Sequence, residues 1–507
     1  MMHTISEHDT QHYVLTLRYN DHDQRHELVL RSKQAGNHFA VHTKVQILDH
    51  AGNFVEMREI APDVFDELIQ NVHAFGPTEG MYLTKKTVSR SVRMLAPSTK
   101  RMDPEDIRHR RTPQETSFTA TGDKLLYHWP VFKKLRDTGH GSIIRATMTN
   151  HQVCMSHCQY CSTIGRNKKD SVTLEEAKAF VNTLYHDQAE HNRNRFPEYN
   201  ELYRQATGSD IRLRGLILSG GGQPNIWPHF EEFVDWLKDL DISLGLITNG
   251  FPRKVDDDIY RHFDWIRISV TPENASPFYP QGKFNLQRIP ETIQHNPDIT
   301  LGLSYVYGPW TEDEILHRLE SAATDWGADY VRLLTDCNLS RDIQLRSHND
   351  LAERLFRLGL IREDGTPAGH IFHQLKYHGT PEEAEQLWDQ GQCHLQSFNV
   401  FWDTTGHEDQ GWSNCYPCDS VTVLAEEITD PDAQLPERKF NSDKWGTVPN
   451  TEVHKLYSEP VQAYFDPRKQ CSACLFVKNN QIAKDLATRA DYADIQVDPE
   501  ILHVNFP

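Results

Sequence analysis

The stretch M-T-N-H-Q-V-C-M-S-H-C-Q-Y-C-S-T-I, residues 148–164, places three cysteines in one short segment. The residues just before it, I-I-R-A-T-M-T at 143–149, have the pattern of a short β-strand, and a helix start signal follows at Thr173. Cys154, Cys158 and Cys161 are therefore expected on a strand-to-helix connection, where barrel enzymes keep their chemistry. Thiolates select iron–sulfur clusters, zinc or Cu(I). No fourth ligand is obvious nearby, so a cluster with one open iron is the natural inference.

The spacing C-x3-C-x2-C, with Tyr160 just before the last cysteine, resembles the signature of the radical S-adenosylmethionine (radical SAM) enzymes. In that family the three cysteines bind three irons of a [4Fe-4S] cluster, and the fourth iron takes the amino and carboxylate groups of S-adenosylmethionine. The resemblance implies reductive cleavage of S-adenosylmethionine to a 5′-deoxyadenosyl radical, which abstracts hydrogen from a substrate. It also implies a one-electron reductant of the flavodoxin or ferredoxin type. A zinc loop completed by His151 or His157 is the alternative.

Length and composition are those of a multidomain protein. With 507 residues the chain exceeds what one hydrophobic core usually supports, so two or three domains are expected. No apolar run approaches the ~20 residues that span a bilayer, and the start M-M-H-T-I-S-E-H-D lacks a secretion signal, so we expect a cytoplasmic protein with no membrane contact. Nine cysteines in such a chain indicate metal ligands rather than disulfides.

The charge distribution bears on nucleic-acid binding. With 53 basic and 72 acidic residues the formal charge is −19, which argues against broad binding to phosphates. One basic segment, from Lys85 to Arg111, carries nine Lys or Arg. A solvated linker is its first interpretation, and contact with an acidic peptide, a phosphate or RNA is the alternative.

The pattern along the chain predicts three domains. Residues 1–125 are expected to hold a β-rich domain with strands and hairpins, followed by the basic linker. From Ile143 strands alternate with helices, which is typical of a parallel sheet. Two helices are expected to begin at capping boxes, Thr173 with Glu176 and Thr311 with Glu314. Six strands are predicted, at 143–149, 215–219, 244–248, 265–270, 300–307 and 330–334. This α/β pattern matches the partial (β/α)6 barrel, of TIM-like form, of the radical SAM core, expected over 126–340.

The predicted strand ends carry the expected cofactor-binding residues. The second strand ends S-G-G-G-Q-P, where the family usually has a G-G-E-P-like segment. Glycine lets the backbone approach a ligand closely, so Gly220, Gly221, Gly222 and Gln223 are implied to meet the methionine ammonium, with Gln223 departing from the family's Glu. By the same resemblance Tyr160 belongs to the cofactor site. Ser269, on the fourth strand, is implied to contact the ribose or carboxylate, and a plain strand serine is its alternative.

A second group of cysteines lies in the last third of the chain. Cys393 precedes two C-x2-C pairs, Cys415 with Cys418 and Cys471 with Cys474, a spacing that lets two thiolates meet one ion or cluster. The segment resembles the SPASM and twitch extensions of radical SAM enzymes, which we expect over 341–507. Five thiols suffice for one auxiliary [4Fe-4S] cluster, on Cys393, Cys471 and Cys474 plus Cys415 or Cys418. A structural zinc on the two pairs is the alternative.

The expected function is that of a radical SAM oxidoreductase acting on an unactivated C–H bond. The favoured substrate is a peptide modified during natural-product maturation, because of the SPASM-like tail and the extra N-terminal domain. A small molecule or nucleoside is the next choice. A zinc protein, non-enzymatic or hydrolytic and with RNA bound at the basic segment, is the alternative of another class.

Overall fold

The structure is a computed structural model. It describes strands between residues 2 and 92 and, from residue 113 on, all residues except 157, 159, 162, 164–166, 251–256, 272–285, 287, 294–297, 340, 375–392, 420–447, 462–473 and 475. The chain divides into two compact units, Met1–Met102 with Asp491–Ile501 and Asp103–Ala490 with Leu502–Pro507. Among the described residues, no helix combines the length and the apolar character needed to cross a bilayer.

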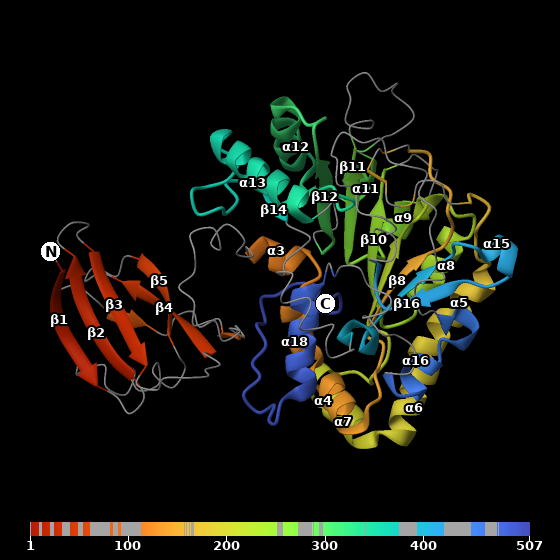
Figure 1. Ribbon diagram of the computed structural model, residues 1–507, viewed down its shortest axis with the longest axis horizontal. Coiled ribbons are helices and arrows are strands. Elements are labelled where there is room, and N and C mark those ends of the chain that lie inside the picture. Colours follow the sequence, from red (N-terminus) through yellow and green to blue (C-terminus); the bar gives the residue numbers. More distant parts are fainter. Residues whose placement is uncertain are drawn as a thin grey trace. The chain divides into compact units, whose positions relative to one another are not determined.

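The first unit contains two antiparallel sheets, as the alternating pattern of its sequence predicts (Figure 1). One sheet joins β1 (Met2–Asp9), β2 (Tyr13–Asn20) and β3 (Arg25–Ser32). In the other, β4 (Val41–Leu48) pairs with β5 (Phe54–Ile60), β6 (Tyr82–Thr84) and β7 (Arg90–Val92). Apart from β7, the basic segment from Lys85 to Arg111 lies outside the described residues.

The second unit is built on one ten-stranded sheet in the order β14-β13-β12-β11-β10-β9-β8-β15-β16-β17. All six predicted strands are present and parallel: β8 (Arg145–Thr149), β9 (Gly215–Ser219), β10 (Ser243–Thr248), β11 (Trp265–Val270), β12 (Thr300–Tyr307) and β13 (Tyr330–Thr335). Parallel strands β14 (Ile371–Gln374) and β15 (Asn399–Asp403) extend the series, and β16 (Asn414–Tyr416) and β17 (Val448–Pro449) are antiparallel. The expected α/β fold with an open, largely parallel sheet is confirmed.

This sheet therefore contains strands from both sides of residue 340. The predicted domain divisions at residues 125 and 340 stay predictions. The consequence for the candidate site is that β15, from the last third of the chain, lies directly beside β8, the strand that leads into the cysteine segment.

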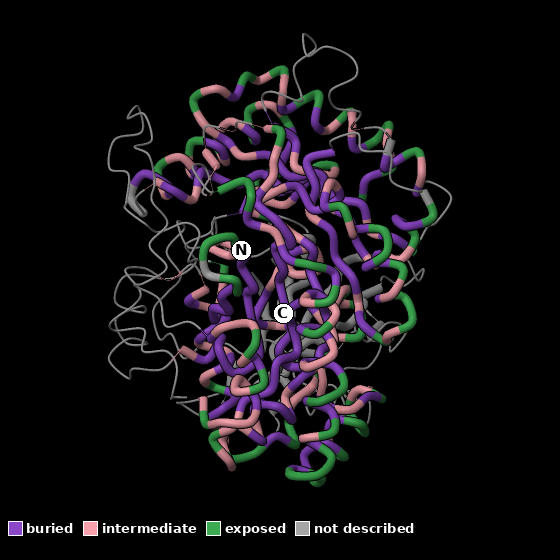
Figure 2. Tube along the Cα trace, turned by 90° about the vertical axis from the view of Figure 1, so that its right-hand side faces the viewer, coloured by how far each residue is buried: buried purple, intermediate pink, exposed green. Residues whose placement is uncertain are grey.

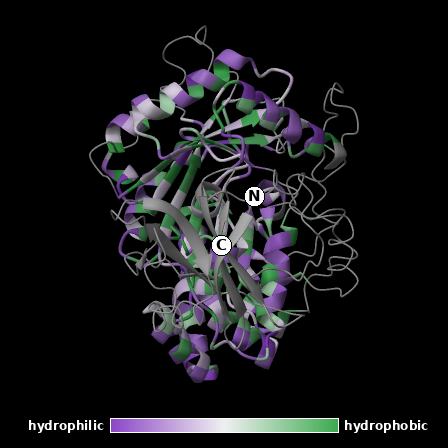
Figure 3. Ribbon diagram, turned by 90° about the vertical axis from the view of Figure 1, so that its left-hand side faces the viewer, coloured by the Kyte–Doolittle hydropathy of each residue, from purple (hydrophilic) through white to green (hydrophobic). Residues whose placement is uncertain are grey.

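Helices cover one face of the sheet and bury its apolar side chains. Those between consecutive strands include α5 (Leu174–Asn182), α8 (Phe230–Leu237), α9 (Asp257–Tyr260), α11 (Arg288–Ile293), α12 (Asp313–Trp326) and α13 (Arg341–Arg357). Phe180 of α5 and Phe233 of α8 share one buried cluster with Met148 of β8 and Leu218 of β9. Buried segments run through the interior of the trace in Figure 2, and Figure 3 shows hydrophobic (green) stretches along coloured strands of the sheet.

The two expected capping boxes have different outcomes. At α5 the prediction is confirmed, because Glu176 N–H donates to Thr173 Oγ1 at 3.2 Å and Thr173 N–H donates to the Glu176 carboxylate at 2.8 Å. The prediction at Thr311 is wrong. Helix α12 begins one residue later, at Asp313, and the Thr311 hydroxyl accepts from Gly308 N–H at 3.1 Å, so it closes the preceding turn instead.

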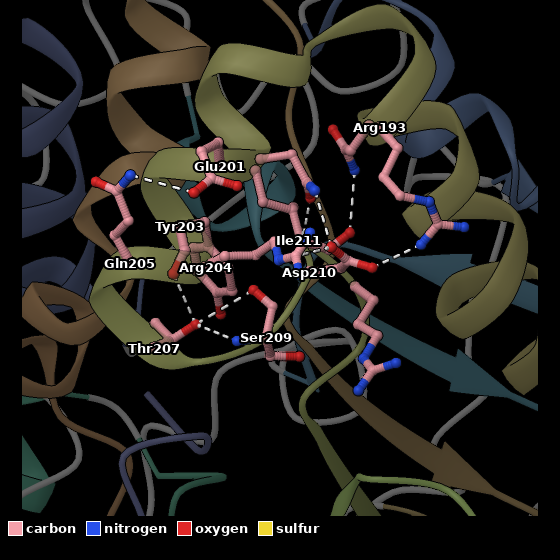
Figure 4. A network of polar contacts seen from close by, with 12 residues as sticks. Arg193, Glu201, Tyr203, Arg204, Gln205, Thr207, Ser209, Asp210 and Ile211 are labelled. Atoms are coloured by element: carbon pink, nitrogen blue, oxygen red, sulfur yellow. Dashed lines mark hydrogen bonds and ion pairs between the residues drawn. The ribbon is translucent and has the colours of Figure 1, made fainter.

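A second group of helices packs near the start of β8: α4 (Trp129–Thr138), α6 (Gln188–Arg195) and α7 (Pro197–Thr207). The Asp210 carboxylate ties α6 and α7 to the segment before β9, because it accepts from Arg193 at 2.6 Å and from Asn200 at 2.9 Å (Figure 4). Asn200 in turn accepts from Ile211 N–H at 2.8 Å. These polar contacts fix the connection that leads into β9.

Lys134 of α4 anchors the entry to β8. Its side chain is fully buried, and Nζ donates to Gly141 O at 2.9 Å, Ser142 Oγ at 2.6 Å and Asn192 Oδ1 at 2.8 Å. Burial lowers the pKa of Lys134 to about 7. All three acceptors would lose their partner if the amine were removed.

We predict that Lys134→Met lowers the free energy of unfolding by about 3 kcal/mol, because it keeps the stem but leaves buried acceptors unpaired. The matched control is Lys133→Met, since Lys133 makes a partly exposed pair with Asp137 and should cost less than about 0.5 kcal/mol. Urea unfolding followed by circular dichroism measures both values. Equal costs for the two variants would contradict the anchoring role.

Candidate functional site

The cysteine segment and the glycine segment after β9 are bonded to each other through their backbones. Gly222 N–H donates to His151 O at 3.1 Å, and Gln223 N–H donates to Val153 O at 2.7 Å. The His151 ring adds a third bond, from Nε2 to Gln223 O at 2.7 Å. The residues that lead directly into Cys154 are thereby fixed beside the glycines.

This close approach requires glycine. A Cβ on Gly222 would lie 2.4 Å from Val153 O and 2.6 Å from His151 O, and one on Gly220 would lie 1.6 Å from Gly222 O. Such distances are far inside van der Waals contact, so a side chain on Gly222 would separate the two segments, and one on Gly220 would displace Gly222. Two of the glycines expected at the cofactor site, Gly220 and Gly222, thus also have a structural role: they allow close backbone packing.

The three thiols lie within eight consecutive residues and are each partly exposed. Cys161 N–H donates to Cys158 O at 3.1 Å, and Cys161 Sγ lies 3.2 Å from Thr163 Oγ1. The Thr163 hydroxyl donates to Gly221 O at 3.1 Å, so the far end of the segment is also tied to the glycines. Burial raises the pKa of the Cys154 thiol.

Asn249, at the carboxyl end of β10, is a functional candidate that sequence reasoning assigned no role. Its Nδ2 donates to Cys154 Sγ at 3.6 Å and to Ser156 Oγ at 3.0 Å. Gln223 holds it in place, because the Gln223 Oε1 accepts from Asn249 N–H at 2.8 Å and its Nε2 donates to Thr248 Oγ1. The Gln223 side chain is 2% exposed and is used for this positioning. The sequence T-N-G at residues 248–250, where the predicted strand ends, was the signal that could have identified Asn249.

Tyr160 contacts residues that follow two further strands, β12 and β13. Its ring stacks on Trp310, which follows β12, with centroids 5.5 Å apart, and its carbonyl accepts from Asn338 Nδ2 at 2.8 Å. Asn338 follows β13, and its N–H donates to Asp336 at 2.9 Å. Burial raises the pKa of the Tyr160 hydroxyl. Sequence reasoning missed Trp310 and Asn338, because their link to Tyr160 depends on the sheet order.

The turn after β15 supports the segment from the other side. Gln152 Nε2 donates to Asp403 Oδ1 at 2.9 Å and to Thr404 Oγ1 at 2.8 Å. Thr149, the last residue of β8, donates to Asp403 Oδ1 at 3.2 Å. The sequence offered no signal for this contact, since it joins residues about 250 positions apart. Ser269 lies on β11 opposite Ser304 of β12, and its cofactor role stays a prediction.

The second cysteine group is partly assembled. Asn480 of α18 (Val477–Thr488) lies between two thiols, accepting from Cys393 Sγ at 3.8 Å and donating to Cys474 Sγ at 3.5 Å. Burial, with the neighbouring Cys474, raises the pKa of Cys393 to about 12. Cys415 lies instead in the apolar cluster under the helices, where it is 2% exposed and burial raises its pKa.

Cys418 lies two residues beyond β16 and is partly exposed. Cys471 lies outside the described residues. Within the described ranges, no three His, Cys, Asp or Glu side chains converge as the ligands of a single ion do. The donor set of the first segment, three thiols that would each bind a different iron, fits a cluster.

Comparisons with known proteins returned only structural likenesses. No family model matches the chain, and no curated protein matches it. Streptococcus suis SuiB bound to precursor peptide SuiA aligns with a TM-score of 0.38 and 11% identity over 83% of this chain and 89% of that one. SuiB bound to S-adenosylmethionine gives 0.39 and 10%, over 65% and 69%. BtrN in complex with AdoMet and 2-DOIA gives 0.28 and 10%, over 68% and 91%. The chain's own topology, a parallel α/β sheet with three cysteines after its first parallel strand in chain order, is the fold that the resemblance to radical SAM enzymes predicts.

We predict that Gly222→Ala destabilises the second unit by about 2 kcal/mol and loosens the cysteine segment, because the new Cβ would collide with Val153 O. Gly208→Ala is the control. Its Cβ would meet nothing within 4 Å, and only its φ of +78° costs energy, about 1 kcal/mol. Urea unfolding measures stability, and limited proteolysis reports exposure of residues 154–163. An unchanged cleavage pattern in Gly222→Ala would contradict the proposed contact.

Proposed function

We propose that this protein is a radical SAM enzyme in which Cys154, Cys158 and Cys161 hold a [4Fe-4S] cluster with one iron open to S-adenosylmethionine. The observation that carries the proposal is the set of backbone bonds that joins residues 151–153 to Gly222 and Gln223. Because of these bonds, three partly exposed thiols and a strip of glycine backbone lie side by side at the carboxyl end of parallel strands, where α/β enzymes bind ligands.

The protein's own residues would bind S-adenosylmethionine and orient the substrate. When bound, the cluster supplies the electron that cleaves S-adenosylmethionine to a 5′-deoxyadenosyl radical, and an external reductant restores that electron. Backbone groups of Gly220–Gly222 are proposed to meet the methionine ammonium, and Ser269 the ribose or carboxylate. Asn249 donates to the Cys154 sulfur, and hydrogen bonds to sulfur tune the potential of such clusters. Holding the substrate carbon close to the radical then selects the product.

A peptide is the proposed substrate, with a small molecule or nucleoside as the second candidate. The support is the second cysteine group, whose spacing resembles the SPASM and twitch extensions, together with the separate N-terminal unit. A chain that acts on a small molecule alone would need neither the second cysteine group nor the N-terminal unit.

An auxiliary [4Fe-4S] cluster is proposed on Cys393, Cys418, Cys471 and Cys474. The approach of Cys393 and Cys474 to the same Asn480 side chain supports the first pair. Cys418 is preferred to Cys415 because its neighbour Asp419 lines the same cavity as Phe476, two residues after Cys474. Cys415 is surrounded by apolar side chains.

We predict that replacing Cys154, Cys158 and Cys161 together by Ala abolishes 5′-deoxyadenosine formation and removes about four irons per chain after anaerobic reconstitution. Cys337→Ala, outside the segment, should keep both. Liquid chromatography of reactions with dithionite and S-adenosylmethionine measures the nucleoside, and elemental analysis measures iron. A colourless, zinc-containing wild-type protein, or nucleoside formation in the triple variant, would refute the proposal.

The auxiliary site has its own test. Cys474→Ala should lose about four irons while the first cluster stays, because one thiolate of four is missing. Cys415→Ala should keep full iron and cost only about 1 kcal/mol of stability through the small cavity it leaves. Iron analysis combined with urea unfolding separates the two effects. Loss of iron in Cys415→Ala would assign that thiol to the cluster in place of Cys418.

A further inference from the structure

The face of the parallel sheet opposite the helices carries both apolar and charged side chains and lines a cavity of about 110 Å³. Residues at alternate strand positions face opposite sides. Ala146 and Met148 of β8 belong to the apolar core, whereas Arg145 and Thr147 line the cavity. By the minimum volume of one water, the space would hold several waters or a small ligand group.

Two aromatic rings leave this space open by lying flat on the sheet. The Trp265 ring comes within 2.2 Å of where a Gly245 Cβ would be, and the Tyr330 ring within 2.0 Å of where a Gly302 Cβ would be. Each glycine faces its aromatic neighbour across one strand pair, Gly245 with Trp265 and Gly302 with Tyr330. Side chains at these glycines would lift the rings into the cavity.

The cavity wall is basic although the chain as a whole carries a formal charge of −19. Arg145 from β8, Arg267 from β11, Arg332 from β13 and Lys124 from η1 (Gly122–His128) line it, and among its described lining residues Asp419 is acidic. Burial lowers the pKa of Lys124 to about 7, so this amine is only partly charged at neutral pH. His503 adds no charge at neutral pH, because burial lowers its pKa to about 4. Three guanidinium groups thus come from three different strands.

Three of these cations donate to backbone or side-chain oxygens of the protein. Lys124 Nζ donates to Ser117 O at 2.9 Å, and Arg145 Nη1 donates to an oxygen of Pro507, the last residue of the chain, at 2.5 Å. Burial lowers the pKa of Arg145, and the Asp419 carboxylate acts against this effect by raising it. Arg332 donates to Gln374 Oε1 at 3.3 Å and to Ser304 Oγ at 3.2 Å.

Arg267 is less satisfied than these three. Its guanidinium lies 5.6 Å from the centre of the Trp265 ring. In the described part of the chain, the Nε atoms of Arg145 and Arg267 are buried without a hydrogen-bond partner. Buried cations in this condition are costly unless an anion joins them.

We propose that this cavity binds an anionic group of the substrate, a carboxylate or a phosphate, through Arg267 with Arg145 and Arg332 beside it. The planar guanidinium matches both anions, since each offers two oxygens to paired N–H donors. The inference rests on the proposed function in one respect: the bound molecule is taken to be the substrate of the radical reaction. Ser219 lines the cavity and directly precedes Gly220, so a substrate held by its anion extends toward the cysteine segment.

Isothermal titration of the full chain with three probes tests the proposal: glutarate, inorganic phosphate and the uncharged glutaramide. We expect saturable binding of at least one anion and none of glutaramide. Arg267→Gln should weaken that binding at least about tenfold, and Arg267→Lys should weaken it less, since the charge remains. Arg204→Gln is the control, because Arg204 is 55% exposed and lies by the Asp210 network (Figure 4).

If the wild-type chain binds phosphate and not glutarate, the substrate's anionic group is a phosphate. If it binds glutarate and not phosphate, that group is a carboxylate. Absence of binding by both anions, or equal affinity in wild type and Arg267→Gln, would overturn the proposal. The triple Ala variant of Cys154, Cys158 and Cys161 is titrated in parallel. Anion binding there together with failed nucleoside formation in the wild type would reject the proposed function and keep the anion site.

Discussion

The candidate site depends on the backbone hydrogen bonds between residues 151–153 and the glycine segment after β9. The described residues of the three-cysteine segment belong to no helix or strand, so their position must come from their neighbours. Gly222 permits the approach because it has no side chain, and the His151 ring reinforces it from within the cysteine segment. A change of glycine here would move the thiols relative to the strands, whatever they bind.

The remaining contacts around this segment come from four other strand ends. Asn249 follows β10, Trp310 follows β12, Asn338 follows β13 and Asp403 ends β15. They contact a thiol, an aromatic ring, a backbone carbonyl and a side-chain amide of the segment. In a parallel sheet the carboxyl ends of all strands lie at one edge, so residues far apart in sequence can meet one short segment. The arginine-lined cavity lies on the face of the same strands opposite the helices.

Periodicity and spacing predicted the local features well. The six strands and the cap of α5 depend on neighbouring residues, and all are present. The cap at Thr311 failed because its hydroxyl had a nearer partner in the Gly308 turn. The roles of Asn249 and Asn338, and the grouping of Arg145, Arg267 and Arg332, depend on which strands are neighbours. A single sequence does not contain that information.

The pairing of β15 with β8 has a consequence for how the chain could be shortened. Between β9 and β15, the strand that leads into the cysteines is an interior strand with partners on both sides. A fragment that stopped before residue 393 would leave β8 as an open edge with unpaired amide and carbonyl groups, the kind of edge that recruits foreign strands and aggregates. By supplying β15, the last third of the chain therefore keeps β8 from being an edge strand.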